Sequence, residues 1–265
     1  MGVPRVVVGD RTAFLRRPDY RTVRVLALAG LVVLWELVTR TGVVSSLFLP
    51  SPFGVLAEGW DMAASGQLLV HLVTSLERLA WGFAIGALAG ISVGVAVGFF
   101  SLADAVVQPI IAATFPIPKI ALLPLLILWL GIGEASKIAV VALGVFFPMA
   151  INTYSGVRQA DPLLIRAAVS FGAGRWSVIR KVILPSALPM VFAGLRLGAG
   201  IALLLLVAAE QIAADAGIGF LILQSGNLME TTKLMVGIVV LSALGVLSHW
   251  ALAGLERAVI RWRHT

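Results

Sequence analysis

Three charged residues lie inside or at the ends of long apolar stretches: Lys119, Arg196 and Glu210. An ionised side chain is costly in such surroundings and often has a function. Lys119 follows Pro116 and Pro118, so it is a candidate cation that helps an anion across an apolar barrier. The alternative is that Lys119 reaches the membrane surface or binds carbonyl groups that a kink has freed.

The other two charged residues have different expected roles. We expect Glu210 near the outer end of a span, where a gating or structural salt bridge is favoured over direct contact with a substrate. We expect Arg196 near the inner membrane border in a structural role. The neighbouring Glu77 and Arg78 are interpreted as an interfacial pair. The candidate pathway or gating residues are therefore Pro116, Pro118, Lys119 and Glu210.

Residues for catalysis are scarce in this sequence. Cysteine is absent, and the histidines His71, His249 and His264 lie far apart without metal-ligand spacing. The phosphate-binding pattern Gly-x-x-x-x-Gly-Lys-Ser/Thr is also absent, as is a plausible nucleophile and base pair. We expect no catalytic residue, no metal site and no ATP hydrolysis in this chain.

The elements that position these residues are predicted to be membrane-spanning helices. Apolar residues make up 60% of the 265 residues and charged residues 12%, about half of the roughly 25% typical of soluble domains. Charge-free stretches at 79–103, 138–157 and 234–255 approach or exceed the ~20 residues that cross a bilayer. This composition excludes a soluble enzyme. The net charge of +7 is better explained by basic cytoplasmic loops than by nucleic-acid binding.

Six spans are predicted. They cover about 25–41, 74–100, 106–131, 137–157, 190–213 and 233–255. Prolines interrupt the third span, which is tolerated in a membrane only where protein or a wet cavity satisfies the freed backbone groups. This span should therefore face the protein interior. Between the spans we expect an interfacial helix at 53–64 and a re-entrant or interfacial segment within 214–232.

Basic residues set the predicted orientation. Of the 20 Lys and Arg residues, 14 fall in the segments 1–24, 158–189 and 256–265, and only four fall on the opposite side. Cytoplasmic loops carry such an excess, so both termini are predicted to be cytoplasmic. Residues 1–24 are a basic cytoplasmic tail in this scheme, and 25–265 form the transmembrane domain.

The loop at 158–189 has an unusual surface for a connector. Asp161 is suited to cap a helix, and Pro162 to its first turn. Ala167, Ala168 and Phe171 then fall on one side, a smooth surface with one knob that suits docking into a groove. The alternative is an amphipathic connector on the lipid surface.

The rest of this loop contains helix-ending residues. Gly172 and Gly174 are expected to end the first helix. A second helix at about 175–183 carries Arg175. Pro185 and Pro189 are then expected to turn the chain into the fifth span.

The residues of this loop resemble the EAA loop of ABC importer permeases. The matching positions are Ala167, Ala168, Gly172, Leu184 and Pro185, with Val182 in place of an isoleucine. Segments 49–52, 122–125, 129–134, 147–148, 152–157 and 208–210 also look like permeases of the nitrate, sulfonate and taurine group. Arg166 departs from the pattern, because it stands where the family has a glutamate.

The resemblance implies an all-α type I ABC importer permease fold with six transmembrane helices, in the inner membrane of a bacterium. The loop 158–189 would be its coupling loop, and the ATPase-coupling residues would be Arg166, Ala167, Ala168, Phe171, Gly172 and Arg175. The implied partners are a dimer of ATP-binding subunits that holds ATP and Mg, a periplasmic or lipid-anchored binding protein, a second permease copy and membrane lipid, without nucleic acid.

Two other function classes and several substrates stay open at this level. The rivals are a secondary transporter driven by an ion gradient and a membrane enzyme. The substrates are nitrate, taurine, alkanesulfonates, bicarbonate-like anions and thiamine-precursor pyrimidines.

Overall fold

A computed structural model describes residues 20–260 of the chain, and every regular element in that part is helical. The predicted basic tail at 1–24 therefore lies almost entirely outside the described residues. The α-helices are α1 (Tyr20–Arg40), α2 (Pro52–Ala64), α3 (Gln67–Phe99), α4 (Ser101–Thr114), α5 (Leu123–Leu130), α6 (Glu134–Arg158), α7 (Pro162–Ser170), α8 (Arg175–Val178), α9 (Leu184–Ala213), α10 (Ile218–Asn227) and α11 (Thr231–Val259). A 3₁₀ turn covers Lys119–Leu122 and a π-helical turn covers Ile179–Ile183.

Four of the described helical stretches are long and apolar enough to cross a membrane: α3, α6, the run Arg175–Ala213 and α11. They contain the predicted spans at 74–100, 137–157, 190–213 and 233–255, apart from Phe100 at the end of the first. A bent pair, α4 with Lys119–Leu130, would make a fifth. Helix α1 covers the first predicted span apart from Thr41 but is not among these stretches, so a total of six remains a prediction.

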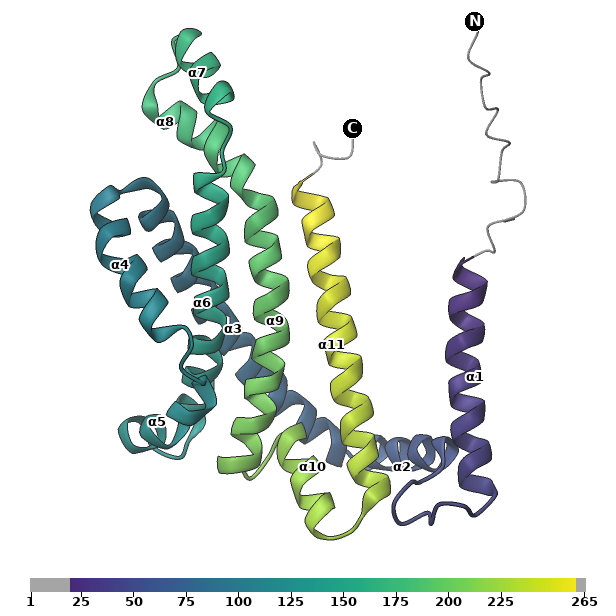
Figure 1. The fold of residues 1–265 in the computed structure, drawn as a ribbon. Coiled ribbons are helices and arrows are strands. Elements are labelled where there is room, and N and C mark those ends of the chain that lie inside the picture. Colours follow the sequence, from purple (N-terminus) through teal and green to yellow (C-terminus); the bar gives the residue numbers. More distant parts are fainter. Residues whose placement is uncertain (1–19, 261–265) are drawn as a thin grey trace, which may run out of the picture.

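Figure 1 shows how these helices are arranged. Helices α3, α6 and α9 form the centre of the bundle, α11 runs beside α9, and α1 stands apart near α2. The loop with α7 and α8 protrudes from one end, while α2, α5 and α10 lie at the opposite end. Helix α1 begins, and α11 ends, on the side of α7. This arrangement agrees with the predicted topology, although the cytoplasmic side itself remains a prediction.

A stripe of glycines joins α3 to α6. Its members recur at every fourth residue of α3, and a Cβ at any of them would lie 2.4 to 2.6 Å from an atom of α6. They are Gly82, Gly86, Gly90, Gly94 and Gly98. Small residues at this spacing let helix backbones approach closely in a membrane, where apolar burial alone does not drive association. We call this set the glycine stripe.

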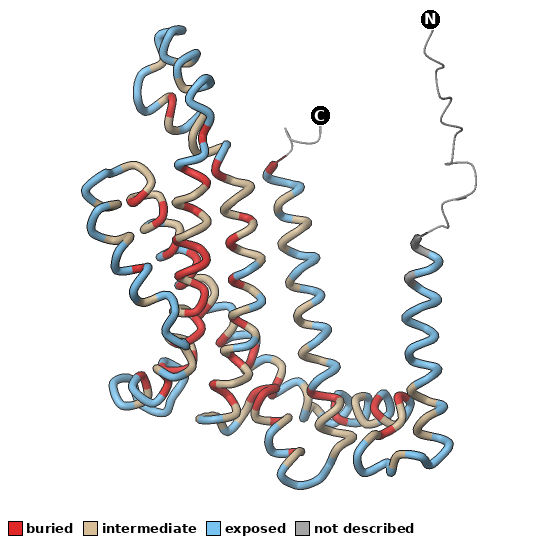
Figure 2. Tube along the Cα trace, viewed as in Figure 1, coloured by how far each residue is buried: buried red, intermediate tan, exposed pale blue. Residues whose placement is uncertain are grey.

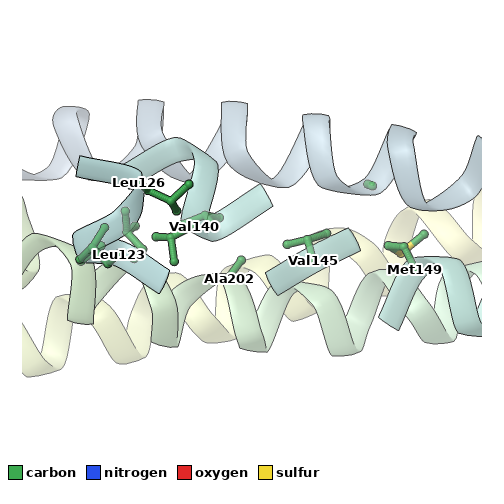
Figure 3. Close-up of a cluster of buried hydrophobic side chains, with 10 residues drawn as sticks. Leu123, Leu126, Val140, Val145, Met149 and Ala202 are labelled. Atoms are coloured by element: carbon green, nitrogen blue, oxygen red, sulfur yellow. The ribbon is translucent and has the colours of Figure 1, made fainter. Parts of the chain in front are cut away.

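The core lies where α6 meets its neighbours. Buried residues are concentrated on the central helices, whereas α1 is exposed along most of its length (Figure 2). The main cluster, shown in Figure 3, joins side chains from the helices α3, α5, α6 and α9; its labelled members are Leu123, Leu126, Val140, Val145, Met149 and Ala202. Apolar side chains on the exposed faces of α1 and α11 are the surface expected of helices in lipid.

The proline-rich span is broken, as predicted. Helix α4 ends at Thr114, and the chain passes through Pro116 and Pro118 into the 3₁₀ turn before α5 begins. The two halves meet at an angle of 91°. Proline lacks the backbone donor that would continue the α-helix, so the break falls where two prolines stand two residues apart.

The prediction that Pro185 and Pro189 turn the chain is wrong. Helix α8, the π-helical turn and α9 form one continuous run, in which Pro185 lies in the first turn of α9 and Pro189 lies inside it. The π-helical turn explains how the run continues. The N–H of Leu184 donates to the carbonyl of Ile179, five residues back. This wider turn precedes Pro185, which has no N–H to offer the carbonyl of Lys181.

Candidate functional site

Helix α7 begins with the predicted cap. The Asp161 carboxylate accepts a hydrogen bond from the N–H of Leu163 at 2.7 Å, and Pro162 occupies the first helical position. Such a cap satisfies a donor that the first turn leaves without a helical partner. The start of this short helix is therefore determined by its own sequence.

Helix α7 ends in a Schellman motif. Gly172 has a φ of +81°, and its N–H donates to the carbonyl of Val169 at 2.9 Å. The N–H of Ala173 donates to the carbonyl of Ala168 at 3.0 Å. This pair of bonds defines the motif and favours glycine at the left-handed position. The predicted end at Gly172 is confirmed.

The cap leaves two aromatic side chains exposed on the protrusion. Phe171 is 92% exposed and Trp176 is 71% exposed. Ala167 is also exposed, and Ala168 is half-buried. Exposed aromatic groups on a protruding element typically mark a binding surface. The sequence analysis selected Phe171 but missed Trp176. The position of Trp176 in the first turn of α8 could have indicated that it is exposed beside Phe171.

Two arginines flank this aromatic surface. Arg166 is exposed, and its Nε donates to the carbonyl of Pro162 at 3.3 Å. Arg175 is exposed at the start of α8. The structure thus brings the predicted coupling residues together in one protrusion. We refer to residues 161–178 as the docking protrusion.

Lys119 is engaged by the broken span itself. Its Nζ lies 2.7 Å from the carbonyl oxygen of Thr114, 3.1 Å from that of Phe115 and 2.9 Å from that of Ile117. It also lies 4.0 Å from the centroid of the Phe147 ring. The ammonium group has three protons, and three acceptors are present. The geometry favours the alternative in which Lys119 holds carbonyls freed by the kink between α4 and α5.

Glu210 lies in a second cluster, at the end of the bundle opposite α7. The residue is 0% exposed, and its carboxylate accepts hydrogen bonds from the Ser75 hydroxyl at 2.8 Å, from Arg78 Nη1 at 2.9 Å and from the N–H of Gly219 at 2.8 Å. The expected salt bridge is present. Sequence reasoning placed Glu210 beside the re-entrant segment, and its bond to Gly219 of α10 shows that contact.

Arg78 is the partner of Glu210, which corrects its predicted pairing. The Arg78 side chain is only 2% exposed, whereas Glu77 points to the exposed surface. Arg78 faces inward because the helix places it on the same side as His71 and Ser75, which lie seven and three residues before it. This polar stripe at the start of an apolar helix was the signal that sequence reasoning passed over.

Arg78 also binds a second carboxylate. Its Nη2 donates to Glu134 at 2.7 Å, and its Nε donates to the other Glu134 oxygen. Glu134 begins α6 and is 56% exposed on its side chain. Lys137, one turn later, is buried, donates to the carbonyls of Ile132 and Gly133, and lies 3.6 Å from Glu134. The cluster is therefore balanced, with two cations and two carboxylates.

The remaining candidate has a structural partner. Arg196 of α9 forms an ion pair with Glu256 of α11, which agrees with the structural role expected of it. Lys119 and Glu210 are not bonded to each other and belong to separate clusters. Within residues 20–260, no three His, Asp or Glu side chains come together as metal ligands.

Known membrane transport proteins are similar to this chain, as the resemblance of the loop 158–189 predicted. Residues 82–261 match the model of the family described as binding-protein-dependent transport system inner membrane component. The taurine transport system permease protein TauC of Escherichia coli (strain K12) is 38% identical over 91% of this chain and 90% of TauC. SsuC of Bacillus subtilis (strain 168), named as an aliphatic sulfonates transport permease protein, is 36% identical over 89% of this chain and 86% of SsuC.

The fold also matches a solved transporter. A structure of the MetNI methionine ABC transporter in an inward-facing conformation has a TM-score of 0.59 and covers 70% of this chain and 93% of the matched chain, at 23% sequence identity. Three findings agree that this chain is a transport permease. The bundle is all-helical, the family model matches most of the chain, and the relatives match nearly its full length. The chain belongs to the family of binding-protein-dependent transport system inner membrane components, the membrane-spanning permeases of ABC importers.

Proposed function

We propose that this permease imports a small organic sulfonate, such as taurine or an alkanesulfonate, and that ATP hydrolysis by a separate subunit drives the import. The relatives TauC and SsuC support the substrate class. The observation that carries the ATP coupling is the docking protrusion, because Phe171 is 92% exposed at its tip. An aromatic side chain so placed gains most by inserting into a groove on a partner.

The continuous run from α8 to α9 supplies a mechanical connection. An ATPase subunit that moves the docking protrusion pulls on α8, and α8 continues through the π-helical turn into α9. Helix α9 then reaches the opposite end of the bundle, where it carries Glu210. A displacement at the docking surface therefore reaches both ends of the permease through one helix.

The assembly in this proposal contains two copies of the permease, two ATP-binding subunits that hold ATP and Mg, and a binding protein that delivers the substrate. The permease lies in the inner membrane of a bacterium, with both termini and the docking protrusion in the cytoplasm. The excess of Lys and Arg in the loops on that side supports this orientation.

Selection of the anion rests mainly with the binding protein in this scheme. The cations that the structure places in the described spans are already engaged. Lys119 binds three carbonyls, Arg78 and Lys137 balance two carboxylates, and Arg196 pairs with Glu256. An anion that crosses would therefore meet few unpaired fixed charges, which favours passage over tight binding.

The substitution F171D tests the coupling. Removing the ring and adding a charge should abolish copurification of the ATPase subunit and lower ATP-dependent uptake of taurine at least about tenfold, the factor that corresponds to about 1.4 kcal/mol of lost interaction. The matched control is S170D, which adds the same charge to the neighbouring exposed position. It should retain most of the binding and uptake.

Three results would contradict the proposal. Normal copurification and uptake with F171D would show that Phe171 does not dock the ATPase. Equal losses in both variants would assign the effect to the added charge and not to the aromatic ring. Uptake that continues without ATP and stops when the proton gradient is removed would establish a secondary transporter instead.

A further inference from the structure

The amino end of α10 is held by side chains from other helices. The N–H of Gly217 donates to His71 Nδ1 at 3.1 Å, and the N–H of Ile218 donates to the Ser75 hydroxyl at 2.8 Å. The N–H of Gly219 donates to Glu210 at 2.8 Å. The first amides of an α-helix lack partners within the helix. Here three successive amides are satisfied by α3 and α9.

The charge of Glu210 suits this position. The amino end of a helix carries a partial positive charge, so a carboxylate that binds its amides is stabilised there. Arg78 supplies the full countercharge, and its Nη1 also donates to the carbonyl of Ala216 at 2.6 Å, in the linker before α10. Arg78 thus binds both the carboxylate and the backbone that leads into the helix.

Gly217 shows how closely the linker is fitted around the carboxylate. Its φ is +128°, and a Cβ at this position would lie 2.4 Å from the carboxylate carbon of Glu210. A left-handed conformation favours glycine, and here the neighbouring space excludes a side chain as well. The backbone and the buried carboxylate therefore occupy a single fitted arrangement.

We infer that Arg78 and Glu210 are positioning residues that hold α10 in a fixed place across the ends of α3 and α9. Their bonds reach α10 through Ala216 and Gly219, which lie in and just after the linker. Because Glu210 belongs to α9, α10 must follow α9 when that helix moves. This mechanical consequence rests on the proposed coupling through the docking protrusion, whereas the position of α10 does not.

The two carboxylates of the cluster differ in what they can do. Glu210 has no exposure to solvent and accepts hydrogen bonds from three kinds of donor. Separating it from Arg78 would therefore leave two buried charges without a partner. Glu134 is half-exposed, so water can replace Arg78 as its partner. The Arg78–Glu210 contact, which holds α10, is therefore the harder one to break, and the Arg78–Glu134 contact with α6 is the easier one.

The double variant R78M/E210M separates positioning from folding. Removing one partner leaves an uncompensated buried charge, whereas replacing both with apolar side chains of similar volume is often neutral for stability. The double variant should therefore assemble while α10 loses the two polar anchors that Arg78 and Glu210 supply, through Ala216 and Gly219, and keeps its bonds to His71 and Ser75. The natural absence of cysteine makes a single-cysteine probe simple. Leu221 of α10 is 1% exposed and suits this purpose.

The measurement is the rate at which a small maleimide labels L221C in the full-length, solubilised protein. We expect labelling to be at least about tenfold faster with R78M/E210M than with the native pair, as local opening of α10 becomes more frequent. Deuterium uptake by the peptide 214–227 should rise in parallel. The control E77Q alters the exposed neighbour of Arg78 and should leave the labelling rate unchanged.

An unchanged labelling rate in R78M/E210M would overturn the inference, because the packing of α10 against α9 and α11 and its bonds to His71 and Ser75 would then suffice to hold it. Equal acceleration by E77Q would also overturn it. The labelling needs no ATPase partner, so its failure is distinguishable from failure of the proposed function. In the assembled transporter, stimulation of ATP hydrolysis by the binding protein should fall in R78M/E210M while basal hydrolysis stays near the native level, a pattern that loss of folded protein would not produce.

Discussion

The glycine stripe makes a quantitative prediction about helix packing. The substitution G86A adds one methyl group between α3 and α6, where a Cβ would lie 2.4 Å from the carbonyl oxygen of Ala142 and 2.8 Å from the Val145 Cβ. Ordinary contacts begin near 3.4 Å, so the helices must separate by about 1 Å at this point. The nearest atom belongs to the backbone, which cannot rotate away as a flexible side chain can.

The expected cost follows from overpacking. Extra methyl groups in a well-packed core typically cost about 1–3 kcal/mol. For a protein of this size, each kcal/mol lowers the melting temperature by about 2–4 °C, so G86A should melt about 2–12 °C below a control that makes the same glycine-to-alanine change in a helix without crowding. Separation of α3 and α6 should also weaken the neighbouring contact at Gly90. The two helices approach almost equally closely there, since a Cβ built at Gly90 would lie 2.5 Å from an atom of α6.

The melting temperature is measured by heating the detergent-solubilised protein and then quantifying the remaining folded fraction by size-exclusion chromatography. The matched control is G200A in α9, since no atom lies within 4 Å of a Cβ at that position. Alanine is favoured over glycine in a helix by about 1 kcal/mol, so G200A should be neutral or stabilising. A melting temperature for G86A equal to or above that of G200A would refute the packing argument.

Three further predictions concern single contacts. K119M should destabilise the protein by about 1–3 kcal/mol because it leaves carbonyls at the break without a donor, and thermal unfolding should show this while the KM for taurine stays unchanged. A double-mutant cycle of R196A and E256A should give a coupling energy of about 0.2–1 kcal/mol by the same assay, since the pair is partly exposed. P185A supplies a backbone N–H that can donate to the carbonyl of Lys181, so it should convert the π-helical turn towards α-helix and lower taurine uptake without loss of the bound ATPase subunit.

Local sequence signals predicted the two ends of α7 and the break after α4, although they failed at Pro185 and Pro189. Asp161 and Gly172 mark the start and end of α7 because caps depend on neighbouring residues alone. The prolines at 116 and 118 predicted the break for the same reason. The docking protrusion is one continuous segment, so its candidate residues could be chosen before the fold was known.

The buried cluster could not be predicted in the same way. The bonds that join α3 to the region of α9 and α10 connect residues 132 to 146 positions apart. Hydrophobic periodicity places a residue on a helix face, but it does not say which distant side chain lies opposite. Glu77 and Arg78 looked like a surface pair because they are neighbours, yet successive residues point about 100° apart on a helix. One faces outward and the other binds Glu210.

The π-helical turn has a consequence for how the permease faces its partner. A single π-helical turn accommodates one residue more than an α-helical ladder would, and each residue rotates a helix by about 100°. The number of residues within 179–183 therefore sets the rotational orientation of the docking protrusion about the axis of α9. Deleting one residue there would keep every side chain of the protrusion yet aim Phe171 about a quarter-turn away, so the proposed coupling depends on the length of this segment as well as on its side chains.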